Sequence, residues 1–191
     1  LAREALLPLL ARWDVAQANV LLSHPDHDHA SGLARLSERL PVPRWLGAEP
    51  AHVPVRLPHD ALRLDLAQGR LTLGAPCPEL CLALLRGAWA QGNEGSRALE
   101  VGWRGERLVL LGDAEERGLE GLPLAPGRLR LLLAPHHGSD APAFGGLLER
   151  CPPAEVWISG SEEPAIAREL TRRGIEWRWS GRDGSMALRL P

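Results

Sequence analysis

Three histidines and two aspartates crowd into the stretch LSHPDHDH at positions 22–29. Apolar residues before it predict a short strand over 19–22, and apolar residues at helical spacing after it predict a helix over 30–39. The stretch therefore fills a corner between a strand and a helix. Imidazole and carboxylate groups at positions 24, 26, 28 and 29 cannot all face one way on a regular element, whereas a tight turn brings them together. The pattern predicts a metal site, and the alternative is a solvated polar loop.

Two further predicted strand ends carry side chains that bind metals. Asp113 follows one apolar strand, and His136 and His137 follow another. A rigid sheet holds groups at its strand ends within tight tolerance while the loops stay open to substrate. We therefore expect these side chains to converge with those of positions 24–29. For Asp113 taken alone, a turn residue or a helix cap before Glu115 is an equal alternative.

The order of the other predicted segments indicates an α/β protein. Two hairpins, turning at 68–69 and at 104–105, precede strands that alternate with helices. This order predicts sheets covered by helices on their outer faces, an α/β sandwich, and 191 residues suit a single domain. In chain order we expect a helix ending near Asp14, hairpin 62–73, strand 80–85, hairpin 97–111, helix 115–122, strand 129–133, helix 143–150, strand 155–158, helix 164–173 and strands 175–179 and 185–190.

Composition excludes several classes of protein. Lysine is absent, so all 22 basic residues are arginine, and with 24 acidic residues the net charge is -2. The chain has no strong overall field for nucleic acid, so any contact with phosphates must be local. No apolar run approaches the roughly 18 to 20 residues of a membrane-spanning helix. Because the chain starts at Leu1 and its single methionine is Met186, we expect a piece of a longer protein.

Positions 24–29 resemble the His-x-Asp-x-Asp-His variant of the metal-binding motif of the metallo-β-lactamase superfamily. The stretches LSHPD at 22–26, LGD at 111–113 and PHHGS at 135–139 are similar to the β-lactamase-like domain of the ComEC family of DNA-uptake channels. Asn93 and Ser96 lie where that family has Asn-x-x-Ser before a strand. The resemblance implies a single domain over residues 1–191, a metallo-β-lactamase-like αββα sandwich that lacks its N-terminal strands in this piece.

The resemblance also implies a site for two divalent metal ions. His24 and Asp26 would bind one ion, Asp28 and His29 the other, and Asp113 would bridge them. Two ions about 3.5 to 4 Å apart can activate water and stabilise both oxygens of an in-line displacement at phosphorus. Asp26 stands where many relatives have histidine, which favours Mn²⁺ over Zn²⁺ because oxygen-rich sites suit the harder ion.

The PHHGS stretch would complete the second metal site through one of its two histidines. Both histidines belong to the family pattern, and we favour His136 over His137 as the ligand. The resemblance also implies catalytic roles for Asp28, Asp113 and Ser139. It implies that Asn93, Ser96 and Ser139 bind the substrate.

The function that follows is a nuclease domain of a competence protein. It would hydrolyse DNA, as a single strand, beside an upstream membrane channel domain of the same protein, at the extracytoplasmic face of a bacterial inner membrane. The late Gly-His-Pro of the family is replaced by SEEP at 161–164. One alternative is therefore a catalytically impaired module that binds DNA or uptake partners, and another is a free-standing hydrolase of a different ester.

Overall fold

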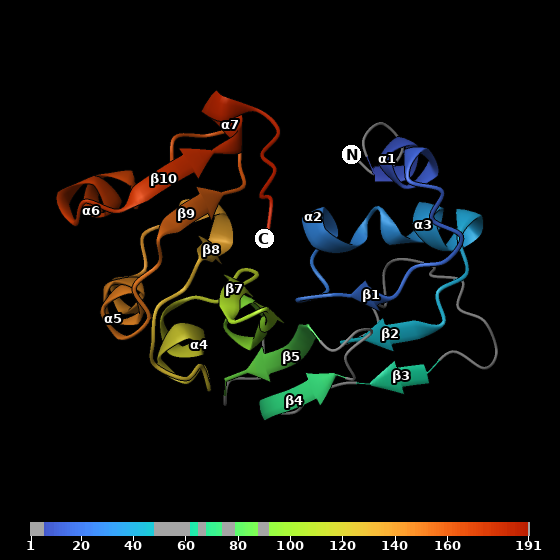
Figure 1. Cartoon of the computed structure of the whole chain (residues 1–191), viewed down its shortest axis with the longest axis horizontal. Helices are drawn as coiled ribbons and strands as arrows, with labels where there is room; N and C mark the ends of the chain where they lie inside the picture. Colours follow the sequence, from blue (N-terminus) through green and yellow to red (C-terminus); the bar gives the residue numbers. More distant parts are fainter. Residues whose placement is uncertain (1–5, 48–61, 65–67, 74–78, 88–91, 191) are drawn as a thin grey trace. The chain divides into compact units, whose positions relative to one another are not determined.

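Two compact units make up the chain, Leu1–Asp65 and Leu66–Pro191, called here the N-terminal and C-terminal units. The computed structural model describes residues 6–47, 62–64, 68–73, 79–87 and 92–190 (Figure 1). Each unit has its own sheet and its own cluster of buried apolar side chains. No helix in the described part of the chain has the length and apolar character needed to cross a bilayer.

The N-terminal unit is a three-stranded parallel sheet with short helices packed on it. Its strands lie in the order β1-β2-β3. Trp45 is the largest side chain of the core and is 1% exposed, with its indole N–H donated to the Gly47 carbonyl at 2.9 Å. Ala30 and Leu36, from two consecutive helices, bury their side chains in the same core. The elements are α1 Leu7–Arg12, β1 Val20–Leu21, α2 His27–Ala30, α3 Leu33–Arg39, β2 Arg44–Leu46 and β3 Leu62–Leu64.

The C-terminal unit contains a seven-stranded mixed sheet in the order β10-β9-β8-β7-β6-β5-β4. Strands β4 to β7 pair antiparallel and β7 to β10 pair parallel, so the connections after β7 cross over through helices. The strands are β4 Gly69–Leu73, β5 Leu80–Arg86, β6 Arg97–Trp103, β7 Glu106–Leu110, β8 Leu131–Leu133, β9 Glu155–Ile158 and β10 Glu176–Trp179. The helices and short 3-10 turns are η2 Asn93–Gly95, α4 Glu116–Glu120, η3 His136–Gly138, α5 Pro142–Arg150, α6 Ala167–Arg172 and α7 Ser180–Asp183.

Helices α4, α5 and α6 cover one face of this sheet (Figure 1). Alternate residues of the strands, such as Val109 and Leu132, point to that face and are fully buried. Phe144 of α5 and Leu170 of α6 complete the same core. Burial of large apolar side chains is the main force that fixes these layers. The fold class predicted from the sequence, α/β, is confirmed.

Three details of the predicted segments are wrong. The hairpin over 62–73 does not form, because β3 pairs with β2 and β4 pairs with β5. Segment 185–190 alternates half-buried and exposed residues as a strand would, yet it pairs with no described strand. The corner over 22–29 is also not all loop, since its second half forms the helical turn α2. In contrast, hairpin 97–111 is confirmed, with Arg104 and Gly105 both at positive φ in its turn.

Candidate metal centre

The serine that precedes the N-terminal histidines links their two rings. The Ser23 hydroxyl lies 3.1 Å from Nδ1 of His24 and 3.3 Å from Nδ1 of His29, and the two ring centroids are 4.2 Å apart. A hydroxyl oxygen has two lone pairs and can accept a hydrogen bond from each Nδ1–H group, which leaves the lone pair of each ring on Nε2. This arrangement turns the opposite ring nitrogens, Nε2, toward the neighbouring carboxylates. Ser23 is a positioning residue that sequence reasoning did not single out.

Each of these Nε2 atoms faces a carboxylate at a distance longer than a hydrogen bond. Nε2 of His24 is 3.8 Å from Oδ2 of Asp26, and Nε2 of His29 is 3.5 Å from Oδ2 of Asp28. Two atoms that are each about 2.1 Å from one tetrahedral ion lie about 3.4 Å apart. The spacing of both pairs therefore fits a shared cation in each. His24 is 1% exposed and so holds its side of the pair firmly in place.

The helical turn α2 explains why these groups converge. Asp26 is the N-cap residue with extended backbone angles, and its carbonyl accepts the N–H groups of His29 and Ala30 at 3.1 and 2.8 Å. Asp28 lies in the first turn, where the helix dipole favours a negative charge. Ala30 is completely buried and anchors the turn in the core. His27 points out with an exposed side chain.

Asp113 lies just beyond the C-terminal end of β7 and is 5% exposed. Its backbone N–H donates to the Ser96 hydroxyl at 3.1 Å, so buried Ser96 supports the Asp113 loop. Gly112 has φ 61 and its carbonyl accepts the N–H of His136 at 3.1 Å. The loop that holds the aspartate is therefore tied directly to the loop that holds the two histidines.

The two neighbouring histidines lie on a left-handed stretch of backbone. His136 has φ 44, His137 φ 54 and Gly138 φ 79. Positive φ is costly for residues other than glycine and marks a site where geometry is imposed by the surroundings. The two ring centroids lie 6.3 Å apart. Each imidazole consequently has different neighbours.

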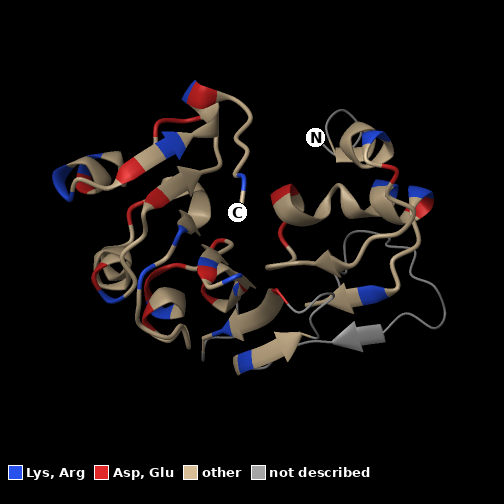
Figure 2. Ribbon diagram, in the orientation of Figure 1, with Lys and Arg blue, Asp and Glu red and all other residues tan. Residues whose placement is uncertain are grey.

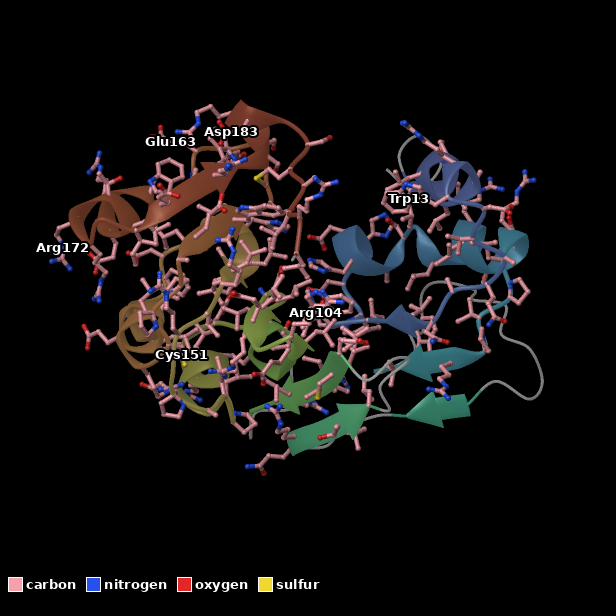
Figure 3. The ribbon with its side chains drawn as sticks, in the orientation of Figure 1. Trp13, Arg104, Cys151, Glu163, Arg172 and Asp183 are labelled. Carbon is pink, nitrogen blue, oxygen red and sulfur yellow. The ribbon has the colours of Figure 1, made fainter. Side chains whose placement is uncertain are left out.

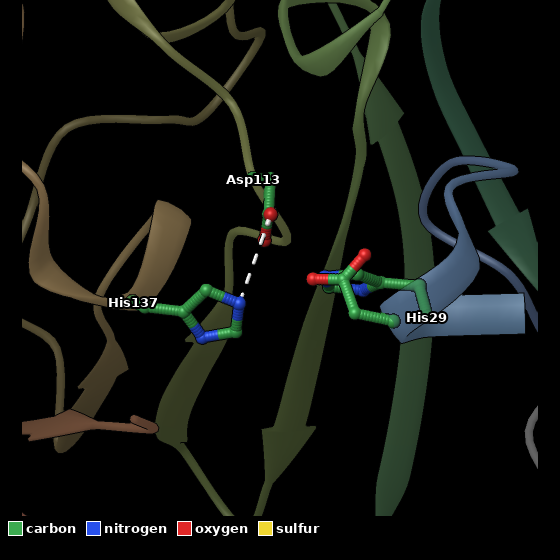
Figure 4. Close-up of side chains that lie close together, drawn as sticks. His29, Asp113 and His137 are labelled. Atoms are coloured by element: carbon green, nitrogen blue, oxygen red, sulfur yellow. Dashed lines mark ion pairs between the residues drawn. The ribbon is translucent and has the colours of Figure 1, made fainter. Parts of the chain in front are cut away.

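His137 is oriented so that its Nε2 could hold a metal ion. Its Nδ1 lies 2.8 Å from the Ser159 carbonyl, which can only accept, so Nδ1 carries the proton. The lone pair is then on Nε2, which lies 4.0 Å from Oδ2 of Asp113 (Figure 4). A backbone carbonyl on the second ring nitrogen is a common support of metal-binding histidines.

His136 is instead engaged by Glu115 and Asn93. Its Nδ1 lies 2.9 Å from Oε1 of Glu115, and the Asn93 amide nitrogen lies 3.0 Å from the same oxygen and 3.4 Å from Nε2 of His136. The sequence prediction favoured His136 over His137 as the ligand, whereas in the structure His137 is the histidine beside Asp113. Glu115, predicted only as the first residue of a helix, is therefore a partner of His136 and Asn93 that the sequence did not indicate.

Ser139 does not cap the helix α5 that follows it. The N-cap of α5 is Ala141, without a side-chain hydrogen bond, and the N–H of Ala143 donates to Glu116 at 2.6 Å. Ser139 is exposed and lines a cavity beside the two histidines.

The arginines near the C-terminus form ion pairs with carboxylates rather than a continuous basic surface. Arg172 and Arg173 both hydrogen-bond to Glu169, and these bonds hold the pKa of that carboxyl at about 2. Arg178 pairs with Glu155 at 2.8 Å. Basic and acidic segments accordingly alternate along α6, β10 and α7 (Figure 2). These arginines are thus a poor phosphate-binding surface as they stand.

Comparison with models of known protein families gave no match, and comparison with curated protein sequences gave none either.

Proposed function

We propose that this chain is a metal-dependent phosphodiester hydrolase, a nuclease domain of the metallo-β-lactamase kind. The observation that carries the proposal is the orientation of His137, whose Nδ1–H is taken up by a backbone carbonyl while its Nε2 faces the buried Asp113 carboxylate. The two His–Asp pairs of the N-terminal unit support it, because their spacing fits shared cations. The seven-stranded α/β unit is compatible with half of an αββα sandwich.

In this proposal the chain binds two divalent ions, with Mn²⁺ favoured and Zn²⁺ the alternative. By the resemblance, His24 and Asp26 would hold one ion, Asp28 and His29 would hold the other, and Asp113 would be a ligand of both. His137 takes the place that the sequence prediction gave to His136. The chemistry such ions supply is polarisation of a phosphate and activation of water at neutral pH.

Residues of the chain itself fix the orientation of the histidine rings and shield Asp113 from water. Ser23 and the Ser159 carbonyl fix ring orientations before any ion arrives, which lowers the cost of assembling the site. Asp113 is shielded from water by its burial, so its charge acts strongly on a nearby cation. Asn93 and Glu115 contact both ring nitrogens of His136 and so restrict the orientation of its ring.

The biological setting is part of the same proposal. We propose single-stranded DNA as the substrate, a membrane channel domain of the same protein as the partner, and the extracytoplasmic face of a bacterial inner membrane as the location. The resemblance of positions 22–29, 111–113 and 135–139 to the DNA-uptake family supports this setting.

The test is metal analysis followed by DNA cleavage. Chain stripped with a chelator should cut labelled single-stranded DNA only after Mn²⁺ is restored, with about two ions per chain. Asp28→Asn and Asp113→Asn should each lower the cleavage rate by at least about a thousandfold. Glu120→Gln, an exposed change at the end of α4, is the control and should cut normally. Unchanged cleavage by both aspartate variants would contradict the proposal.

A second candidate, a binding module without turnover, is favoured by one observation. The stretch SEEP at 161–164 stands where the family that the chain resembles has Gly-His-Pro, so a histidine that could serve turnover is missing. DNA binding that needs the metal ions but leaves the strand intact would support this candidate over the first.

A further inference from the structure

A cavity of about 500 Å³ opens beside the two histidines of the C-terminal unit. One wall is the loop His136–Ser139, and the other is the loop 160–165, which joins β9 to α6. The side chains of His136 and His137 are 34% and 43% exposed, so parts of both imidazoles remain accessible. This volume is within the range of small-molecule sites in proteins.

The cavity is built on a rigid base. The carbonyl of Gly138 accepts the N–H of Ile166 at 3.1 Å, which ties the two walls together. A Cβ placed on Gly138 would lie 2.7 Å from Pro164 and 2.8 Å from Ile158, so only glycine allows this close approach. At the far end, the Gly160 carbonyl accepts the indole N–H of Trp179 at 2.8 Å. The shape is therefore preformed rather than dependent on a ligand.

The chemistry of the walls selects against phosphate. Glu162 and Glu163, two exposed acidic residues, lie on the loop 160–165 that forms the second wall (Figure 3 labels Glu163). Among the described residues that line the cavity there is no arginine. Carboxylates only accept hydrogen bonds, and they repel a phosphodiester. The group that fits is uncharged, flat enough to stack on imidazole and rich in N–H donors.

We infer that this cavity binds a nucleobase of the substrate, with a preference for bases that carry an exocyclic amine. The inference rests on the proposed nuclease function and adds the identity of the group beside the scissile phosphate. Glutamate accepts a hydrogen bond from the cytosine N4 amine, and histidine rings are stacking surfaces for unpaired bases. Thymine presents a single N–H between two carbonyl oxygens, which the carboxylates repel. Glu162 and Glu163 are thus specificity-determining residues.

The experiment measures nucleoside binding without metal and without hydrolysis. The full chain, labelled with ¹⁵N, is titrated with 2′-deoxycytidine and separately with thymidine while backbone amide signals are followed. We expect 2′-deoxycytidine to shift the amides of Gly138, Ser139 and Ser161, with an affinity about five- to tenfold higher than that of thymidine. The double variant Glu162→Gln/Glu163→Gln should bring this ratio close to one, because a glutamine amide both donates and accepts. Glu120→Gln, outside the cavity, should leave the ratio unchanged.

Three results would overturn the inference. They are equal affinity for the two nucleosides, a ratio that the double glutamine variant does not alter, and the lack of any saturable shift in the 160–165 loop. Failure of the nuclease proposal is distinguishable, because it would appear as loss of metal-dependent cleavage while the nucleoside preference remains. A comparison of the cleavage rates of dC-rich and dT-rich strands then extends the test to the metal-loaded chain, which should cut the dC-rich strand faster.

Discussion

The two sets of candidate metal-binding side chains are assembled in opposite ways. In the N-terminal unit, four donors lie within six consecutive residues, 24–29, and Ser23 next to them orients both rings. In the C-terminal unit, Asp113 and His137 come from different strand ends and depend on a third loop for the Ser159 carbonyl. The first set depends on the conformation of one turn of chain. The second set depends on the pairing of β7, β8 and β9, because Asp113, His137 and Ser159 follow these three strands. The second set should therefore be far more sensitive to changes in packing.

The largest expected effect is from Gly138→Ala. The added methyl group meets Pro164 and Ile158 at under 3 Å and must also adopt φ 79. Left-handed strain and overpacking together should lower the free energy of unfolding by about 3 kcal/mol, measured by urea denaturation. Gly146→Ala on α5 is the matched control, since its Cβ would meet nothing within 4 Å, and its effect should stay within about 1 kcal/mol. Similar losses in both variants would contradict the role given to the Gly138 contact.

The next largest effect should separate the two adjacent histidines. His137→Ala removes the ring beside Asp113 and should weaken Mn²⁺ binding by about a hundredfold or more, measured by calorimetry. His136→Ala leaves that ring in place and should weaken Mn²⁺ binding by less than about tenfold. The reverse order of effects would restore His136 as the ligand.

A third prediction concerns the sheet that holds the C-terminal set. Glu100 on β6 is 7% exposed and bonds to Arg70 of β4 and Arg107 of β7. Burial raises its pKa, but the hydrogen bonds and charges of the two arginines outweigh this and hold the pKa below its ordinary value of 4.5. Glu100→Gln should lower the free energy of unfolding by about 2 kcal/mol at neutral pH.

The pH dependence of that loss has a definite sign. A carboxyl with a lowered pKa in the folded state stabilises fully above its unfolded pKa and loses this contribution as pH falls through the folded pKa. The difference between the parent chain and Glu100→Gln should therefore be constant above pH 4.5 and shrink below it. Glu106→Gln, on the same hairpin, provides the control. A difference that grows in acid would contradict the assignment.

The smallest expected effect is at Ser23. Ser23→Ala removes the hydroxyl shared by the two Nδ1 atoms and should weaken metal binding by about tenfold, with little change in stability. The measurement is Mn²⁺ titration of the variant beside the parent chain. A loss as large as that of His137→Ala would mean that the N-terminal set is no more self-contained than the C-terminal one.

The same contrast explains which features could be predicted from the sequence. Hairpin 97–111 was predictable because the turn residues Arg104 and Gly105 specify it locally. The hairpin over 62–73 was not, because β3 and β4 find partners in different sheets, which no local pattern reveals. The segment 185–190 has the alternation of a strand but no neighbouring strand among the described residues to pair with.

The candidate site shows the same division between local and distant information. The donors at 24–29 could be predicted because spacing alone places them in one corner. The choice between His136 and His137 could not, since it depends on left-handed backbone angles and on Ser159, twenty-two residues downstream of His137. Glu115 escaped notice because its contact with Asn93 is made across two loops.

The left-handed turn at His136–Gly138 presents two adjacent imidazoles to different surroundings. His136 contacts the Glu115 carboxylate and the Asn93 amide, whereas His137 contacts Asp113 and the Ser159 carbonyl. Reagents that alkylate imidazole nitrogens would consequently find two inequivalent targets within a single dipeptide. Gly138 directly follows the two histidines, so even a single methyl group at this position would disturb the orientation of both imidazoles.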